Sequence, residues 1–89
     1  MCGIAGFISR SKDPLDCLER MAKAIYHRGP DDHGVWFDRE CGVGFAHTRL
    51  SILDLSHAGH QPMESNSGRY MMVFNGEIYN HQTIRNELN

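Results

Sequence analysis

Three features of this sequence could carry out chemistry together: Cys2, Arg49 and the pair Asn75-Gly76. If Met1 is removed, Cys2 carries a nucleophilic thiol and a free α-amino group, which titrates near neutral pH and can act as the adjacent base. Arg49 can hold a carboxylate through two parallel hydrogen bonds. Asn75 and Gly76 can offer a side-chain amide and a backbone N–H to an oxyanion. These are the roles of nucleophile, substrate clamp and transition-state stabiliser.

Each feature also has a simpler structural interpretation. Taken alone, Cys2 is more typical of a buried core residue. A lipid anchor at Cys2 is disfavoured, because nothing basic or amphipathic follows it. Arg49 could form a surface ion pair with Asp54 or Glu64, a common and weak interaction. The Asn-Gly pair lies between apolar segments, where it is the strongest short-range signal for a type I′ hairpin turn.

Length and composition limit the classes of protein. A chain of 89 residues allows one small domain at most, and such a domain buries only roughly 60–65% of its extended surface. The 40% apolar and 22% charged content is typical of a globular protein, and the net charge of −2 gives no reason to expect nucleic acid or an anionic membrane as partner. The longest apolar run, YMMVF, is far shorter than a membrane helix, and Arg10 comes too early for a signal peptide. Three scattered cysteines do not make a disulfide framework, so a cytoplasmic protein is expected.

The first two predicted elements are a strand and a helix. Residues 3–9 are apolar on both alternating faces, which predicts a strand covered on both sides in a layered fold. Asp13 and Pro14 are typical of a helix start, and Gly29-Pro30 of a stop. The apolar stripe of this helix is expected to be Leu15, Leu18, Ala22 and Ile25.

The rest of the chain reads as short strands joined by polar segments. Residues 27–34 are predicted to be a solvated connection, and strands are predicted at 35–38, 41–49 and 70–74. In the second of these, Gly44, Ala46 and Thr48 make a face of small residues against which another element can lie. Residues 57–68 are expected to be a loop whose histidines lack partners at zinc-ligand spacing, so no metal site is predicted. A short last helix begins after Asn80 and is too short to be stable without packing.

Five motifs in order, covering nearly the whole chain, resemble the class II glutamine amidotransferases. They are MCGIAGF, HRGPDDHG, AHTRLSILD, GHQPM and NGEIYNH. The resemblance is closest to the glutaminase domain of the glutamine-hydrolysing asparagine synthetase branch. It implies an α+β fold of the N-terminal-nucleophile hydrolase type, an αββα sandwich of which residues 1–89 are expected to be the incomplete first part.

The resemblance also implies residue roles. Cys2 corresponds to the nucleophile and its freed amine to the base, while Asn75 and Gly76 correspond to the oxyanion hole. Arg49 corresponds to the residue that binds the α-carboxylate of glutamine. The other implied glutamine-binding residues are Leu50, Ser51, Ile52, Leu53 and Glu77.

The resemblance implies that ammonia released from glutamine passes to an ATP-dependent synthetase domain, which aminates aspartate. No cofactor is expected in this segment, and ATP and Mg are expected only for the synthetase domain. The expected partners are glutamine and that domain, with a homodimer left open and neither nucleic acid nor membrane.

Two further expectations concern residues beyond Asn89. The family binds the α-amino group of glutamine through an aspartate that would lie there, so the chain alone is expected to be weakly active or inactive. The alternatives are an amidotransferase of the same branch with another acceptor, and an inactive truncated product or binding module.

Overall fold

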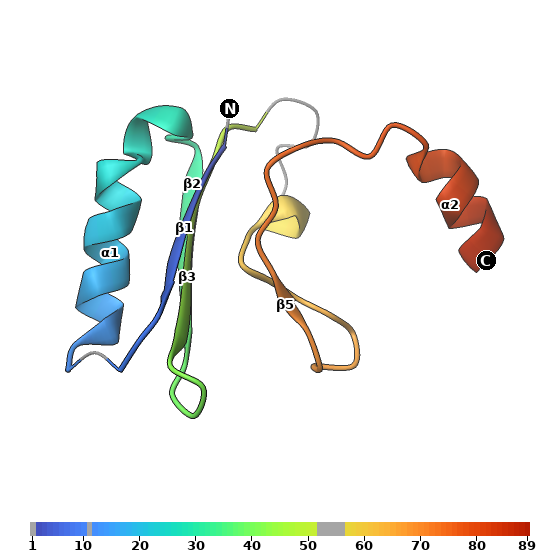
Figure 1. Ribbon diagram of the computed structural model, residues 1–89. Helices are drawn as coiled ribbons and strands as arrows, with labels where there is room; N and C mark the ends of the chain where they lie inside the picture. Colours follow the sequence, from blue (N-terminus) through green and yellow to red (C-terminus); the bar gives the residue numbers. More distant parts are fainter. Residues whose placement is uncertain (1, 11, 52–56) are drawn as a thin grey trace.

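The computed structural model describes residues 2–10, 12–51 and 57–89 and has a three-stranded sheet between a helix and a smaller, two-stranded sheet (Figure 1). The larger sheet is antiparallel, in the order β1 (Gly3–Ile8), β3 (Val43–Arg49), β2 (Asp32–Asp38). Its register pairs Gly3 with Thr48 and Asp32 with Arg49. The start of β1, the end of β3 and the start of β2 therefore meet at one end of the sheet.

Helix α1 (Pro14–Ala24) begins at its predicted start but ends before the predicted stop at Gly29-Pro30. Asp13 is the N-cap and its side chain accepts a hydrogen bond from the Asp16 N–H at 3.4 Å. The short 3₁₀ helix η1 (Tyr26–Arg28) follows. Leu18 is fully buried, as the apolar stripe predicted, but Leu15 is 55% exposed. The prediction is wrong for Leu15, because it lies in the first turn, at the rim of the sheet beside Arg39.

The core lies between α1 and one face of the large sheet. Leu18, Ala22 and Ala46 are its buried residues, with five partly buried apolar residues packed around them: Ala5, Phe7, Met21, Val35 and Phe37. A Cβ on Gly44 would lie 2.9 Å from Phe7 Cζ and 3.1 Å from the Leu18 methyl groups. The small face of β3 therefore allows α1 to pack closely, as the alternation of residues predicted.

The opposite face of the sheet is less completely covered. Trp36 and Phe45 stack on it with ring centroids 5.6 Å apart. However, β1 lies at the sheet edge, Ile4 is 49% exposed and Ile8 is 83% exposed. The prediction that the first strand is covered on both faces is therefore wrong for the elements described, since only the face bearing Ala5 and Phe7 packs against α1.

The second layer is formed by η2 (His57–Gly59), β4 (Met63–Glu64) and β5 (Met71–Met72). Two predictions for this region are wrong. The strand expected at 70–74 pairs only over Met71–Met72, and the segment expected to be loop contributes β4. A type I′ turn needs positive φ at both central residues, but the described residues with positive φ are only Gly42 and Gly68. Asn75-Gly76 therefore forms no such turn, and the chain continues into α2 (His81–Leu88).

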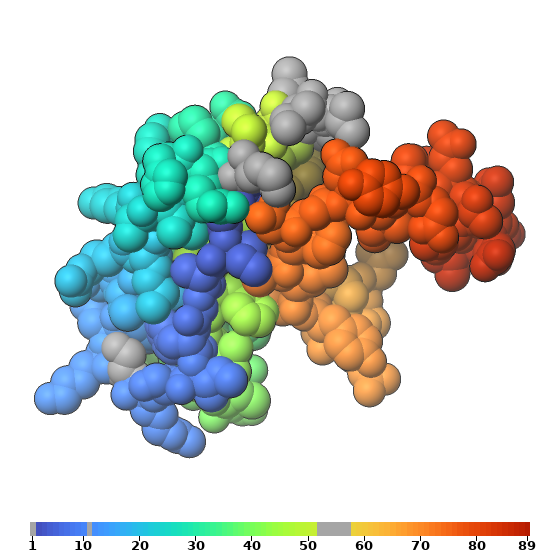
Figure 2. All heavy atoms as spheres, turned by 45° about the horizontal axis from the view of Figure 1, so that its top comes forward, coloured from blue at the N-terminus to red at the C-terminus, as the bar shows by residue number. Residues whose placement is uncertain are grey.

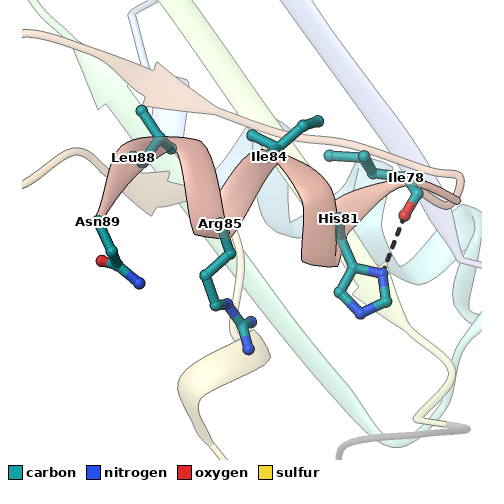
Figure 3. A pocket seen from close by; sticks show the side chains of 6 residues that line it. All are labelled: Ile78, His81, Ile84, Arg85, Leu88 and Asn89. Atoms are coloured by element: carbon teal, nitrogen blue, oxygen red, sulfur yellow. Dashed lines mark hydrogen bonds between the residues drawn. The ribbon is translucent and has the colours of Figure 1, made fainter.

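Helix α2 stands apart from the layers, at the end of the chain (Figure 1). Asn80 is in the N-cap position, but its side chain makes no capping hydrogen bond. His81 Nδ1 instead lies 3.2 Å from the Ile78 carbonyl oxygen, on one wall of a shallow pocket that Ile84 and Leu88 also line (Figure 3). Within the described ranges, neither helix is long and apolar enough to cross a membrane.

Candidate active site

Cys2 lies where β1 begins, beside the residue that follows β3. The Leu50 N–H points at Cys2 Sγ with an N···S distance of 3.4 Å, and the same sulfur lies 3.9 Å from the Leu50 carbonyl oxygen. Cys2 is half-buried and is not in a disulfide. The sulfur is therefore oriented by the backbone of the segment that was predicted to line the glutamine pocket.

The main chain at Cys2 is also fixed. Arg28 Nε donates to the Cys2 carbonyl oxygen at 3.1 Å. The next residue, Gly3, is packed so closely that a Cβ there would lie 2.9 Å from Thr48 Oγ1. The Thr48 hydroxyl in turn donates to the Ile25 carbonyl oxygen at 3.2 Å. The segment between α1 and β2 thus holds the start of β1 in place.

The motif HRGPDDHG wraps around the end of β3. Pro30 forms a parallel bridge with Arg49, and the Asp31 N–H donates to the Arg49 carbonyl oxygen at 3.0 Å. Asp31 Oδ2 accepts from the Ser51 N–H at 2.8 Å. A Cβ on Gly29 would lie 2.4 Å from the Arg49 carbonyl carbon. The prediction of a solvated connection is confirmed for the exposed residues His27, Arg28, Pro30 and Asp31, but it is incomplete. The segment also shapes the backbone beside Cys2, and its last three residues belong to β2.

Arg49 is a buried arginine, 8% exposed, at the same end of the sheet. Its guanidinium group lies against Gly59 in η2, where a Cβ would be 2.4 Å from Nη2. The following residue, His60, places Nδ1 2.5 Å from Asp32 Oδ2 on β2. The second layer is thus attached to the sheet next to Arg49 and covers its side chain.

The segment that leads from β5 to Asn75, Gly76 and Glu77 lies beside β1. Val73 lines a hollow together with Ile4 on β1, and the orange segment after β5 lies against the blue N-terminal strand in Figure 2. Asn75 is half-buried, whereas Gly76 and Glu77 are exposed. No hydrogen bond between described residues joins Asn75 or Gly76 to Cys2.

Of the predicted site residues, the structure brings Cys2, Arg49, Leu50 and Ser51 together at one end of the sheet. After β5 the chain passes with Val73 beside β1 and then leads through Asn75 to α2, away from the sheet (Figure 1). Ile52 and Leu53, the other two predicted pocket residues, lie outside the described residues.

Sequence reasoning missed the residues that position this site. Residue types alone assigned Asp31, Asp32 and Arg28 to a connection, and assigned His60 and Gln61 to a loop. Their roles depend on contacts with chain segments up to 28 residues away. The one sequence signal that could have indicated these positioning roles is that the residues belong to the motifs HRGPDDHG and GHQPM.

His47 is buried between the sheet and the second layer and is 1% exposed. Neither ring nitrogen makes a hydrogen bond of good geometry with a described residue. Burial is the main cause that lowers the pKa of His47 below its ordinary 6.5, and the positive charges of His60 and Arg49 lower this pKa further. The Phe74 backbone and Asp32 raise the pKa, but their effect is smaller than that of burial. The folded protein therefore favours a neutral imidazole at this position.

We expect His47 to make the fold less stable in acid. Because its folded pKa is lowered, its contribution is fully present above pH 6.5 and is lost as the pH falls through that value toward the folded pKa. Each unit of lowering corresponds to about 1.4 kcal/mol. Urea unfolding at pH 7 and pH 5 should show a smaller acid loss for His47→Met than for the unsubstituted protein. The exposed-site control His27→Gln should keep the full loss, and an equal loss in His47→Met would contradict the assignment.

Among the described residues, no group of three His, Cys, Asp or Glu side chains is placed to hold a metal ion. The chemistry that the site offers is that of its thiol, its buried guanidinium and the polar groups around Asn75. This combination suits attack on a small substrate that bears a carboxylate.

Comparison with known proteins identifies the class. The glutamine amidotransferase domain family matches residues 1–89. Asparagine synthetase (glutamine-hydrolyzing) 2 of Bacillus subtilis is 44% identical over 99% of this chain and 12% of its own length. Asparagine synthetase (glutamine-hydrolyzing) 1 of the same organism is 39% identical over 99% of this chain and 14% of its own length. Amidase chry2 of Gibberella zeae is 41% identical over 99% of this chain and 15% of its own length.

The chain belongs to the glutamine amidotransferase domain family, which confirms the resemblance carried by its five motifs. It spans only 12–15% of the length of these three relatives. No solved structure matches it.

Proposed function

We propose that this chain carries the glutamine-hydrolysing site of a glutamine-dependent asparagine synthetase, with Cys2 as the nucleophile. The observation that carries the proposal is the placement of Cys2 Sγ at 3.4 Å from the Leu50 N–H, next to the buried Arg49. A thiol and a cation are thus fixed at one end of a sheet. The family match and the similarity to two asparagine synthetases support the choice of reaction.

The proposed fold is the first part of an N-terminal-nucleophile αββα sandwich, and the proposed domain is an incomplete glutaminase domain over residues 1–89. The described layers support this proposal. Helix α1, the three-stranded sheet and the β4–β5 layer stack in that order (Figure 1). The incompletely covered face that bears Ile4 is compatible with further strands of such a sandwich.

The proposed reaction is acyl transfer through a thioester. The freed amine of Cys2 takes the thiol proton, and the sulfur bonds to the side-chain amide carbon of glutamine. The oxyanion accepts hydrogen bonds from Asn75 and the Gly76 N–H, each worth about 10²–10³ in rate. The protonated amine then gives its proton to the leaving nitrogen, and the C–N bond breaks to release ammonia. Water hydrolyses the glutamyl thioester to glutamate and restores the thiol.

Substrate binding is assigned to the surroundings of Cys2. In this proposal the Arg49 guanidinium binds the α-carboxylate of glutamine, and the backbone from Leu50 to Leu53 and Glu77 line the pocket. Asp31 supports the proposal because it holds the Ser51 N–H at 2.8 Å and so shapes the start of that backbone.

The whole protein is proposed to pass the ammonia to an ATP- and Mg-dependent domain that aminates an activated aspartate. Its expected partners are glutamine and that domain, with a second copy of the chain left open. A cytoplasmic location is part of the proposal and is supported by three cysteines that form no disulfide. The alternative is an amidotransferase of the same branch with another acceptor; one relative of similar identity is named an amidase and not an asparagine synthetase.

The test uses the protein in the full length that its gene encodes, purified from its native source. We expect an N-terminal Cys2 in the intact mass, steady ammonia release from glutamine, and a covalent adduct on Cys2 from a diazoketone analogue of glutamine. An acceptor assay with aspartate then separates the two amidotransferase candidates. A chain that keeps Met1 and is not labelled would contradict the proposal and favour the binding-module alternative.

A further inference from the structure

The segment that carries Asn75 and Gly76 is not held by strand pairing in the described chain. β5 ends at Met72, and the last ladder pair is Met63 with Met72. Gly76 is exposed, and the ring of Phe74 lies close to it: a Cβ on Gly76 would be 3.0 Å from Phe74 Cζ. Something other than the sheet must therefore set the direction of the N–H groups in this segment.

Gln61 supplies such a contact. Its side-chain Oε1 accepts the Phe74 N–H at 2.6 Å, directly before Asn75. The acceptor is half-buried and is brought across 13 residues of chain. A short hydrogen bond at this point fixes the peptide plane between Val73 and Phe74, and with it the path of the two residues that come next.

Gln61 is itself anchored on the large sheet. A Cβ on Gly34 in β2 would lie 2.3 Å from the Gln61 carbonyl oxygen, so the two backbones are in direct contact. The preceding residue, His60, is held by Asp32 on the same strand. Gln61 therefore fixes the position of the segment after β5 relative to β2. The partner strand of β2 is β3, which ends at Arg49.

We infer that Gln61 is a positioning residue for the oxyanion site: its side-chain oxygen holds the Phe74 N–H and thereby aims Asn75 and Gly76. This inference rests on the proposed function, because it concerns the groups that stabilise the tetrahedral intermediate. Gln61 does not touch the substrate. Its effect is expected in the transition state, where the placement of oxyanion donors matters, and not in the binding of glutamine.

The test compares Gln61→Met, which removes the acceptor at similar length, with Gln61→Glu, which keeps an acceptor oxygen. Both are made in the full-length protein, with Gln82→Met on the exposed face of α2 as the matched control. We expect Gln61→Met to lower kcat for ammonia release by about 10–100-fold with KM for glutamine within about threefold, because misplaced groups cost turnover. Gln61→Glu should restore kcat to within about threefold of the unsubstituted protein, and Gln82→Met should leave it unchanged.

Alkylation of Cys2 by iodoacetamide at the unsubstituted rate shows that the nucleophile end of each variant remains folded. With that condition met, unchanged kcat in Gln61→Met overturns the inference. Equal losses in Gln61→Met and Gln61→Glu, or a loss that appears in KM alone, also overturn it. If the unsubstituted protein releases no ammonia from glutamine, the proposed function and the inference both fail. If it releases ammonia and only the Gln61 variants behave differently from expectation, the inference alone fails.

Discussion

We expect that replacing Cys2 with alanine abolishes the proposed release of ammonia from glutamine. The expected loss in kcat is at least about 10³-fold, because in the proposed mechanism the thiol forms the bond that is made in the first step. Arg28 holds Cys2 by its carbonyl oxygen and Leu50 by its sulfur, so the substitution removes the two Sγ contacts with Leu50 and leaves the main-chain anchor. The measurement is coupled-assay ammonia release by the full-length protein.

The other two cysteines provide matched controls. Cys17 is half-buried on α1 and Cys41 is exposed in the turn before β3, and alanine at either position should leave ammonia release unchanged. Product formation from added ammonium salt should also survive in Cys2→Ala, because the acceptor reaction proposed for the full-length protein does not use the thiol. Ammonia release from glutamine that persists in Cys2→Ala would remove Cys2 from the mechanism. Loss of ammonia release in Cys41→Ala as well would indicate general damage to the fold.

If Arg49 binds the α-carboxylate as proposed, replacing it with lysine is expected to lower kcat/KM for glutamine by about 10²-fold, mainly through KM. Lysine keeps the positive charge but not the planar fork that binds a carboxylate through two hydrogen bonds, and hydrogen bonds to charged groups contribute about 1.5–3 kcal/mol. The guanidinium is packed closely against Gly59, and an ammonium group does not reproduce its planar contact surface. Steady-state kinetics with glutamine gives both constants.

A modified substrate makes this test specific. The unsubstituted protein should discriminate strongly against glutamine whose α-carboxylate is converted to an amide, whereas Arg49→Lys should discriminate much less. Arg85→Lys on the exposed helix α2 is the matched control and should behave as the unsubstituted protein. If Arg49→Lys retains the full preference for the free carboxylate, Arg49 does not bind that group.

The local part of this fold could be predicted from sequence because its signals are local. Asp13 and Pro14 mark the start of α1, and the alternation around Ala46 assigns the two faces of β3, without any long-range information. The predicted burial of Leu15 and Ile8 is wrong, because burial depends on contacts that are not local in the sequence. Whether an apolar side chain is covered depends on how far the neighbouring element extends, which no periodicity encodes.

The residues of the candidate site also divide into those that the sequence could predict and those that it could not. Cys2 and Arg49 could be found by residue type, because few side chains can act as a nucleophile or a carboxylate clamp. Asp31 and Gln61 could not, since their contribution is one hydrogen bond each to a backbone N–H that only the folded chain brings near. Turn-forming composition concealed these contacts, and the Asn-Gly signal for a hairpin was overridden by the path of the chain into α2.

The contact between Cys2 and Leu50 also sets an order of events during biosynthesis. It joins residues 48 positions apart, and the Arg28 contact on the Cys2 carbonyl spans 26. Synthesis delivers the N-terminus first, so the chain end is free for processing until the residues that hold it have been made. In the proposed mechanism, which needs the free amine of Cys2, Met1 is therefore expected to be removed before β1 pairs with β3.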